Sequence, residues 1–317
     1  MHTELSLDSA VYLNQYYYTI DNRKRFSQEI IMPSTALSTW SIHNALGPTY
    51  RCADDGSDRM VEVRHHPGVM TLLDVPARMA SLGIRNLEIC HFHFPSVADS
   101  YIGDLRSALE EADISLYSIL IDAGDITHPD ENQREADLAW IRSWLDIAGR
   151  CGATHARIIA GEAEAHGSGG LIDHPAVRLS AENLTVLAAY GKNRGVQVIT
   201  ENFRRLTRRP EPLLAILRLC EGTIGLCVDF GNYPDTTRYD DLAAILPHAT
   251  SIHAKPEYDV AGVMERSDFI RCLDLARDAD FEGPYSLIFS GEGDEWQGVA
   301  GIRDVLTTHT RETSSTS

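Results

Sequence analysis

Residues 196–229 read VQVITENFRRLTRRPEPLLAILRLCEGTIGLCVD and contain one complete structural repeat. An apolar, β-rich run at 196–202 is followed by a helical pattern at 212–220 and by a second apolar run at 224–229. Two short strands joined by a helix form a βαβ unit, in which the strands are parallel. The same alternation recurs along the chain and predicts an α/β fold.

Eight apolar runs of this kind follow one another, at 36–42, 86–94, 115–122, 155–160, 196–202, 224–229, 251–255 and 285–289. Helical patterns separate them. Eight strands in alternation with helices predict a single (β/α)8 TIM barrel over residues 34–309, after an N-terminal extension (1–33) and before a flexible polar tail (310–317). The rival fold is an open Rossmann sheet, which needs a GxGxxG loop after its first strand, and SIHNALGPTY at 41–50 contains none.

The composition restricts the partners of the chain. With 317 residues, 43% of them hydrophobic, and a net charge of −18, it suits one barrel and lacks the basic character of a nucleic-acid-binding protein. No apolar stretch reaches the roughly 18 residues that a membrane span needs, and no signal peptide is evident. Six cysteines without a CxxC pair indicate reduced thiols in a cytoplasmic protein. A homo- or hetero-oligomer stays open, because no interface is evident.

Polar residues close the fifth, sixth and seventh apolar runs. Glu201, Asp229 and His253 follow one another at spacings of 28 and 24 residues, each about one βα unit. The active site of a TIM barrel lies at the C-terminal ends of its strands, and neighbouring strands are roughly 4.8 Å apart. We therefore expect the three side chains to converge on one divalent metal ion. Two carboxylates and an imidazole suit Mn²⁺, Mg²⁺, Co²⁺ or Zn²⁺, with Mn²⁺ favoured.

The segments ENF (201–203), CVDFGN (227–232) and IHAK (252–255) resemble those of the xylose-isomerase-like, or AP-endonuclease-family-2-like, barrels, in the branch of sugar phosphate isomerases and epimerases. The resemblance implies four metal ligands: a glutamate, an aspartate, a histidine and a second glutamate. The first three correspond to Glu201, Asp229 and His253. The fourth does not, because the last strand reads SLIFSGEGDEW at 286–296 and Phe289 stands at the glutamate position. Glu292 or Glu295 could reach back from this loop toward the metal. The acidic, glycine-rich sequence of the loop is equally compatible with a solvated loop that has no such role.

Further residues near the rim are candidates for contact with a substrate. Alternation along 86–94 places His91 and His93 on one face, and His93 at its end is a candidate general base. Lys255 shares the face of His253 and is a second group that could move a proton or hold an oxyanion. Each is also compatible with a structural role. The candidates for substrate binding are Trp40, His43, Arg157, Glu162, Glu292 and Trp296.

The chemistry that this arrangement suggests is removal of a proton next to a carbonyl, with the metal stabilising the enediolate. It predicts an isomerase or epimerase of a sugar or keto-sugar in which Glu201, His93 or Lys255 moves the proton. One alternative is a lyase that eliminates a β-substituent from a keto-sugar, a 3-keto-glycoside, a C-glycoside or a cyclitol, since loss of the second glutamate removes the second base. Another is a catalytically degenerate barrel subunit. An AP endonuclease is disfavoured by the net charge of −18.

Overall fold

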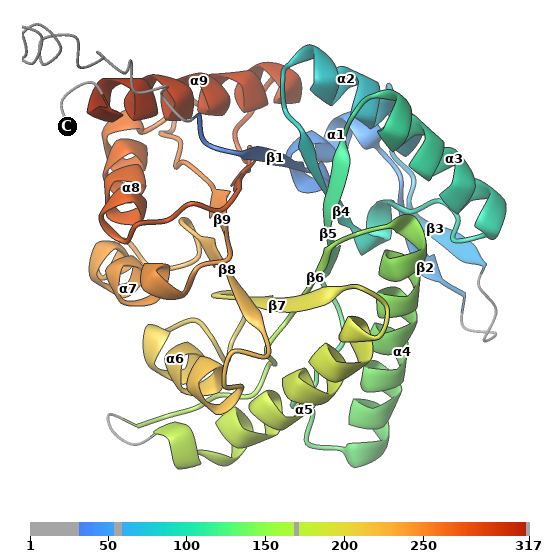
Figure 1. The fold of residues 1–317 in the computed structure, drawn as a ribbon, viewed down its shortest axis with the longest axis vertical. Coiled ribbons are helices and arrows are strands. Elements are labelled where there is room, and N and C mark those ends of the chain that lie inside the picture. Colours follow the sequence, from blue (N-terminus) through green and yellow to red (C-terminus); the bar gives the residue numbers. More distant parts are fainter. Residues whose placement is uncertain (1–31, 54–58, 168–170, 315–317) are drawn as a thin grey trace, which may run out of the picture. The chain divides into compact units, whose positions relative to one another are not determined.

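Eight parallel strands close on themselves in the order β1-β10-β9-β8-β7-β6-β5-β4, and helices form a ring outside them (Figure 1). The predicted (β/α)8 barrel is therefore confirmed. This computed structural model describes residues 32–53, 59–167 and 171–314. The predicted N-terminal extension lies outside these residues except for its last two, and residues 315–317 of the predicted tail also lie outside them.

The barrel strands are short, and successive side chains alternate between the lumen and the helix layer. Neighbouring strands are in parallel register, so that Asp229 lies level with His253, and His253 with Ser286. The strands are β1 (Thr35–Ser38), β4 (Asn86–Cys90), β5 (Ser115–Ile121), β6 (His155–Ile158), β7 (Gln197–Glu201), β8 (Gly225–Asp229), β9 (Ser251–Ala254) and β10 (Tyr285–Leu287).

Two strands end earlier than the sequence predicts. β1 stops at Ser38 and β4 at Cys90, and each passes into a 3-10 turn, Thr39–Ile42 and His91–His93 respectively. Side chains take over the backbone hydrogen bonds at these points: Ser38 Oγ accepts from the Trp40 amide at 3.3 Å, and Thr39 Oγ1 accepts from the Cys90 amide at 2.9 Å. Strict alternation along 86–94 is therefore wrong beyond Cys90, because a 3-10 helix has a period of three residues.

The helices of the outer layer have conventional ends. In α4, Asp130 Oδ1 accepts from the Gln133 amide at 3.0 Å, and Gly152 closes the helix at φ 80°. Helix α9 continues to Ser314, so residues 310–314 of the predicted tail are helical. Within the described residues, no helix has the length and apolar character needed to cross a membrane. The helices are α2 (Val75–Ser81), α3 (Asp99–Glu111), α4 (Glu131–Cys151), α5 (Pro175–Lys192), α6 (Pro210–Leu219), α7 (Arg238–Ile245), α8 (Arg266–Asp278) and α9 (Glu295–Ser314).

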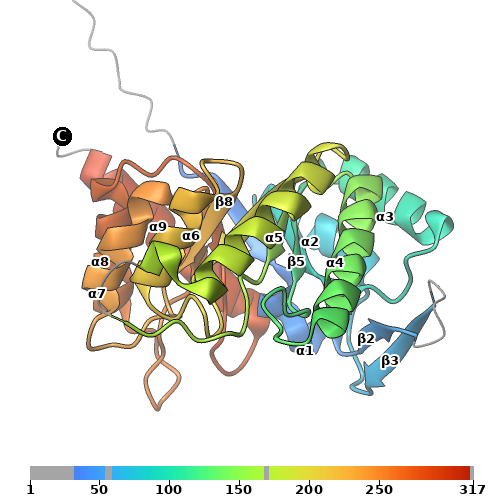
Figure 2. The same ribbon diagram turned by 90° about the horizontal axis from the view of Figure 1, so that it is seen from below.

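A small insertion between β1 and α2 does not follow from the sequence patterns. It consists of α1 (His43–Leu46) and an antiparallel pair, β2 (Thr49–Cys52) with β3 (Met60–Arg64). The pair stands at the same end of the barrel as α1 (Figure 2), and β2 contacts the 3-10 turn that follows β4. Its residues are half-buried or exposed. The run therefore lacks the apolar signal of a barrel strand.

Candidate metal centre

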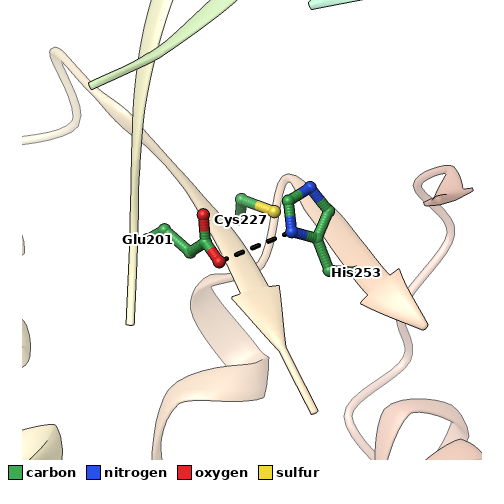
Figure 3. A group of neighbouring side chains, drawn as sticks. All are labelled: Glu201, Cys227 and His253. Atoms are coloured by element: carbon green, nitrogen blue, oxygen red, sulfur yellow. Dashed lines mark ion pairs between the residues drawn. The ribbon is translucent and has the colours of Figure 1, made fainter. Parts of the chain in front are cut away.

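Three neighbouring strands bring Glu201 and Asp229 close to His253 inside the barrel. Glu201 and Asp229 are the last residues of β7 and β8, and His253 lies one residue before the end of β9. All three are buried. His253 Nδ1 lies 3.4 Å from Glu201 Oε1 (Figure 3) and 3.6 Å from an Asp229 carboxylate oxygen. Two ligands about 2.0–2.1 Å from a tetrahedral ion lie about 3.3 Å apart, so these atoms already stand close to ligand spacing.

A buried carboxylate on the opposite side of the lumen orients the His253 ring. Glu88 of β4 is fully buried, and its Oε2 lies 3.1 Å from His253 Nε2 and accepts from Ser286 Oγ at 2.5 Å. A metal-binding histidine typically donates its other ring N–H to a carboxylate in this way. Glu88 is not among the residues that the sequence predicts for the site. The signal was a charged residue inside an apolar strand, which is stable only when paired.

Glu201 is held by two further side chains. Asn232 Nδ2 donates to Glu201 Oε1 at 3.0 Å, and Arg157 Nε lies 2.9 Å from Glu201 Oε2. Arg157 also donates to Asp122 Oδ1 at 2.5 Å and is 3% exposed. This buried arginine fixes the Glu201 carboxylate and balances part of the negative charge. The structure thus places Arg157 directly at the predicted site, whereas Asn232 was not foreseen.

The charges of the candidate centre raise the pKa of His253 and lower the pKa of Asp229. Burial disfavours a charged imidazole, yet Cys227, Glu201 and Glu88 together raise the pKa of His253 well above its ordinary value. Burial likewise disfavours a charged Asp229, but the hydrogen bond from His253 and the charge of Lys255 lower the pKa of Asp229 below its ordinary value. The Asp229 carboxylate is thus held ionised, as a ligand to a divalent ion must be.

The donor set suits a divalent ion. Among the described residues, ligand atoms of Glu201, Cys227 and His253 lie within 4.8 Å of one another (Figure 3). Asp229 lies outside this group of three, and one of its carboxylate oxygens lies 3.6 Å from His253 Nδ1. Carboxylate and imidazole donors are those of Mn²⁺, Mg²⁺, Co²⁺ and Zn²⁺ sites. The residues present therefore fit the predicted metal.

Phe289 does not occupy the place of a fourth ligand. Ser286 faces the lumen, where it meets Glu88, and the ladder continues through the Ile288 amide, which donates to Ala254 O at 3.2 Å. Alternation then directs Ile288 to the lumen and Phe289 to the helix layer. The Phe289 ring packs against α9, where a Cβ added to Gly298 would lie 2.3 Å from it. Phe289 therefore lies on the wrong face of β10 for the predicted ligand position, and Ile288 is the residue that faces the lumen there.

The loop after β10 does not supply a replacement ligand. Glu292 is exposed. Glu295 instead binds α1: its two carboxylate oxygens accept from the Asn44 and Ala45 amides, both at 2.8 Å. Trp296 lies under the guanidinium of Arg78 of α2, 5.6 Å from the ring centroid. Neither Glu295 nor Trp296 is brought to the metal ligands.

A cluster of aromatic and histidine side chains forms the other side of the rim. The rings of Trp40 and His43 are stacked with centroids 5.2 Å apart, and Trp40 is 46% exposed. His43 Nδ1 lies 3.0 Å from His93 Nε2, and His93 Nδ1 lies 2.8 Å from Thr39 Oγ1. Arg64, carried by β3, contacts His43 Nε2. Burial, and then the charge of His43, lower the pKa of His93 to about 3.

The two remaining candidates lie on the loops around the centre. Lys255 packs over Gly231, where an added Cβ would lie 3.0 Å from its Cδ, and it acts electrostatically on Asp229. Glu162 is anchored through its backbone amide, which donates to Asp125 Oδ1 at 3.0 Å, and its carboxylate lies 3.7 Å from Arg204 Nε. Lys255 is thus a neighbour of the ligand set, whereas the Glu162 side chain pairs with a loop arginine.

Comparison with known proteins identifies the class. A family model described as xylose isomerase-like TIM barrel matches residues 76–301, and the chain belongs to this family. A xylose isomerase-like TIM barrel protein from Mycobacterium smegmatis, solved in complex with magnesium, is 19% identical, with a TM-score of 0.59 over 88% of this chain and 98% of the other. No curated protein sequence matches the chain.

Two epimerase structures share the fold. L-ribulose 3-epimerase is 14% identical, with a TM-score of 0.63 over 90% of this chain and 98% of the other. The 3-keto-D-glucoside 4-epimerase from E. coli, in its apo form, is 15% identical, with a TM-score of 0.56 over 75% and 94%. At such identities the likeness shows a common fold. The β2–β3 pair lies outside the residues that the family model matches.

Proposed function

We propose that the chain is a divalent-metal-dependent isomerase or epimerase of a sugar or keto-sugar, and that it removes a proton next to a carbonyl. The observation that carries the proposal is the convergence of Glu201, Asp229 and His253 at the ends of three neighbouring strands. Similarity in fold to L-ribulose 3-epimerase supports it. The partner is a small carbohydrate, and the buried free thiols, such as Cys90 and Cys227, suit a cytoplasmic protein.

The side chains around the centre would divide between holding the ion and binding the substrate. Glu201, Asp229 and His253 would hold the ion, with Mn²⁺ favoured, which when bound polarises a carbonyl and stabilises an enediolate. Arg157 Nη1 is buried without a hydrogen-bond partner and is a donor for a substrate oxygen. The exposed Trp40 ring offers a flat apolar face for a sugar ring.

Glu201 and Lys255 are the groups best placed to move the proton. Glu201 belongs to the proposed ligand set and Lys255 adjoins it, and a catalytic acid or base must lie within reach of the reacting carbon. His93 fits this role less well than its position in the sequence suggests. A base with a pKa of about 3 is poorly matched to neutral pH, and both His93 ring nitrogens are engaged, by Thr39 and His43. His93 would instead position His43.

A lyase is the second candidate, and Ile288 is the observation that favours it. An epimerase that works with two bases needs a second proton-transferring group on the far face of the substrate, whereas β-elimination needs proton removal from one face only. Ile288 cannot transfer a proton, Glu292 is exposed, and the Glu295 carboxylate is bound to the backbone of α1. The substrate would then be a keto-sugar, a 3-keto-glycoside or a cyclitol with a leaving group next to the acidic carbon.

Solvent deuterium exchange tests the proposal. Protein loaded with Mn²⁺ is incubated in D₂O with ketohexoses and with 3-keto-glucosides, and the products are analysed by NMR and mass spectrometry. Incorporation of deuterium next to the carbonyl is expected, and Glu201→Gln should abolish it. An isomeric sugar would support the isomerase, and a released substituent the lyase. Metal-loaded protein that exchanges no proton of any keto-sugar would support the degenerate subunit and overturn the proposal.

A further inference from the structure

Cys227 lies at the floor of the metal centre, beside two of its ligands. It faces the lumen two residues before Asp229, in register with Glu201 on one side and Ser251 on the other. Cys227 is fully buried. Its sulfur, a Glu201 carboxylate oxygen and a His253 ring nitrogen all lie within 4.8 Å of one another, and Figure 3 shows the sulfur directed toward the His253 ring.

The centre lacks one protein ligand on the β10 side. Ile288 fills the lumen position there, and the loop glutamates do not reach back. A sulfur ligand lies about 2.3 Å from a zinc ion and an oxygen or nitrogen ligand about 2.0–2.2 Å, so two such ligands are less than about 4.5 Å apart even on opposite sides of the ion. The 4.8 Å limit on the separation of the three donor atoms therefore asks for only a small adjustment of side chains.

We propose that the Cys227 sulfur is the fourth protein ligand of the centre, and that the site consequently prefers Zn²⁺, Co²⁺ or Fe²⁺ to Mn²⁺ or Mg²⁺. A thiolate is a soft donor that favours these ions, whereas carboxylates alone suit Mn²⁺ and Mg²⁺. In the binding step the S–H bond breaks, its proton leaves to solvent and a sulfur–metal bond forms. The inference rests on the proposed metal site and revises its expected metal.

Cys90 provides a matched control within the same lumen. It is 1% exposed and follows Glu88 by two residues on β4, so that it shares the lumen face of Glu88. Like Cys227 it is a buried thiol whose pKa is raised by burial. It stands on the opposite side of the barrel from β8 in strand order. Cys90→Ser therefore makes the same thiol-to-hydroxyl change as Cys227→Ser, at another buried lumen position that is not proposed to bind the metal.

Cobalt substitution tests the sulfur ligand directly. Metal-free protein is titrated with Co²⁺, and a cobalt–thiolate bond gives a charge-transfer band in the near ultraviolet that oxygen and nitrogen ligands do not give. The native chain and Cys90→Ser should show the band at one equivalent, and Cys227→Ser and Cys227→Ala should lack it. In competition titrations, Cys227→Ser should lose at least about tenfold in Zn²⁺ affinity and much less in Mn²⁺ affinity. Circular dichroism confirms that each variant is folded.

Each outcome decides between the inference and the proposed metal site. Uptake of one Co²⁺ by the native chain without the band, and equal Zn²⁺ affinity of native and Cys227→Ser protein, would overturn the sulfur ligand while leaving the metal site intact. A native chain that binds none of the divalent ions would overturn both. If Cys227→Ser is unfolded, Cys227→Ala and the cobalt spectrum of the native chain still decide the question.

Discussion

The two sides of the barrel rim are built in different ways. On the side of β7, β8 and β9, the candidate ligands belong to regular strands, and Glu201, Asp229 and His253 fall where strand alternation puts them. On the side of β1 and β4, the chain leaves the strand for 3-10 turns, which carry Trp40 and His93. The first side is rich in carboxylates and the second in aromatic and imidazole rings. The contrast fits the proposal of a cation site on the first side and of substrate contacts on the second.

The same residue type behaves in opposite ways on the two sides. His253 faces Glu88 and Glu201, and its pKa is raised. His93 faces other histidines and apolar rings, and burial lowers its pKa to about 3. Environment, not residue type, thus decides which histidine carries charge. Four changes test this division of the rim.

Removal of a ligand should have the largest effect. Glu201→Gln or His253→Ala should abolish stoichiometric metal binding, because each removes a strong donor from a centre that has at most four protein donors. Trp40→Ala should bind metal as the native chain does, since its exposed ring belongs to the other side of the rim. Metal content after dialysis, measured by atomic emission, checks both. Equal metal loss in all three variants would mean that the two sides form one unit.

Strand alternation explains what the sequence could predict. Glu201, Asp229 and His253 end regular strands, so the period of two residues and the βα spacing locate them without further information. Phe289 was misplaced because the depth of β10 in the barrel is set by pairing, which places Ser286 level with His253. A shift of the strand register by one residue exchanges the side chains that face the lumen with those that face the helices, and the sequence alone does not determine this register.

The other side of the rim depends on contacts that are remote in sequence. The 3-10 turn at 91–93 follows a hydrogen bond from the Cys90 amide to Thr39, across 51 residues. Glu88 meets His253 across 165 residues. The periodicity of a sequence reports local structure and not contacts between distant residues. Neither the pairing of His43 with His93 nor the contact of Glu88 with His253 could therefore be predicted. A charged residue inside an apolar strand was the one visible sign.

Arg157→Met should cause the next largest effect, on stability. It leaves the carboxylates of Glu201 and Asp122 without their buried partner, and breaking a buried ion pair costs about 3–5 kcal/mol. Arg178→Met is the control, because its pair with Asp173 is 51% and 76% exposed and exposed pairs contribute less than about 1 kcal/mol. Urea unfolding of metal-free protein measures both. A loss for Arg157→Met as small as that of the control would show that the carboxylates need no partner.

Glu88→Gln tests the contact that joins the two sides of the rim. Glutamine keeps the shape of the side chain but removes the charge that orients His253. Loss of such an outer partner weakens metal affinity by roughly 10–100-fold, and isothermal titration calorimetry should show it. Ser286→Ala, which removes a single hydrogen bond to Glu88, should have a smaller effect. Native metal affinity in Glu88→Gln would confine the centre to the β7–β9 side.

The smallest expected effect concerns the pH dependence of stability and belongs to His93. Its folded pKa of about 3 lies below the unfolded value of about 6.5, so the unfolded chain binds a proton that the folded chain does not. Stability from His93 is therefore full above about pH 6.5 and falls by at most about 1.4 kcal/mol per pH unit as the pH is lowered toward the folded pKa.

Unfolding free energies of metal-free native protein and His93→Gln, measured by urea titration between about pH 6.5 and about pH 5, isolate this contribution, because unfolded carboxylates titrate mainly below that range. The difference between the two proteins should shrink as the pH falls. His253 does not mimic the effect. At the acid end of the range it is protonated in the folded chain because its pKa is raised, and in the unfolded chain because the pH lies below its ordinary pKa of about 6.5. A difference that stays constant with pH would mean that His93 is hydrated in the folded chain, and that the aromatic side of the rim is open to water.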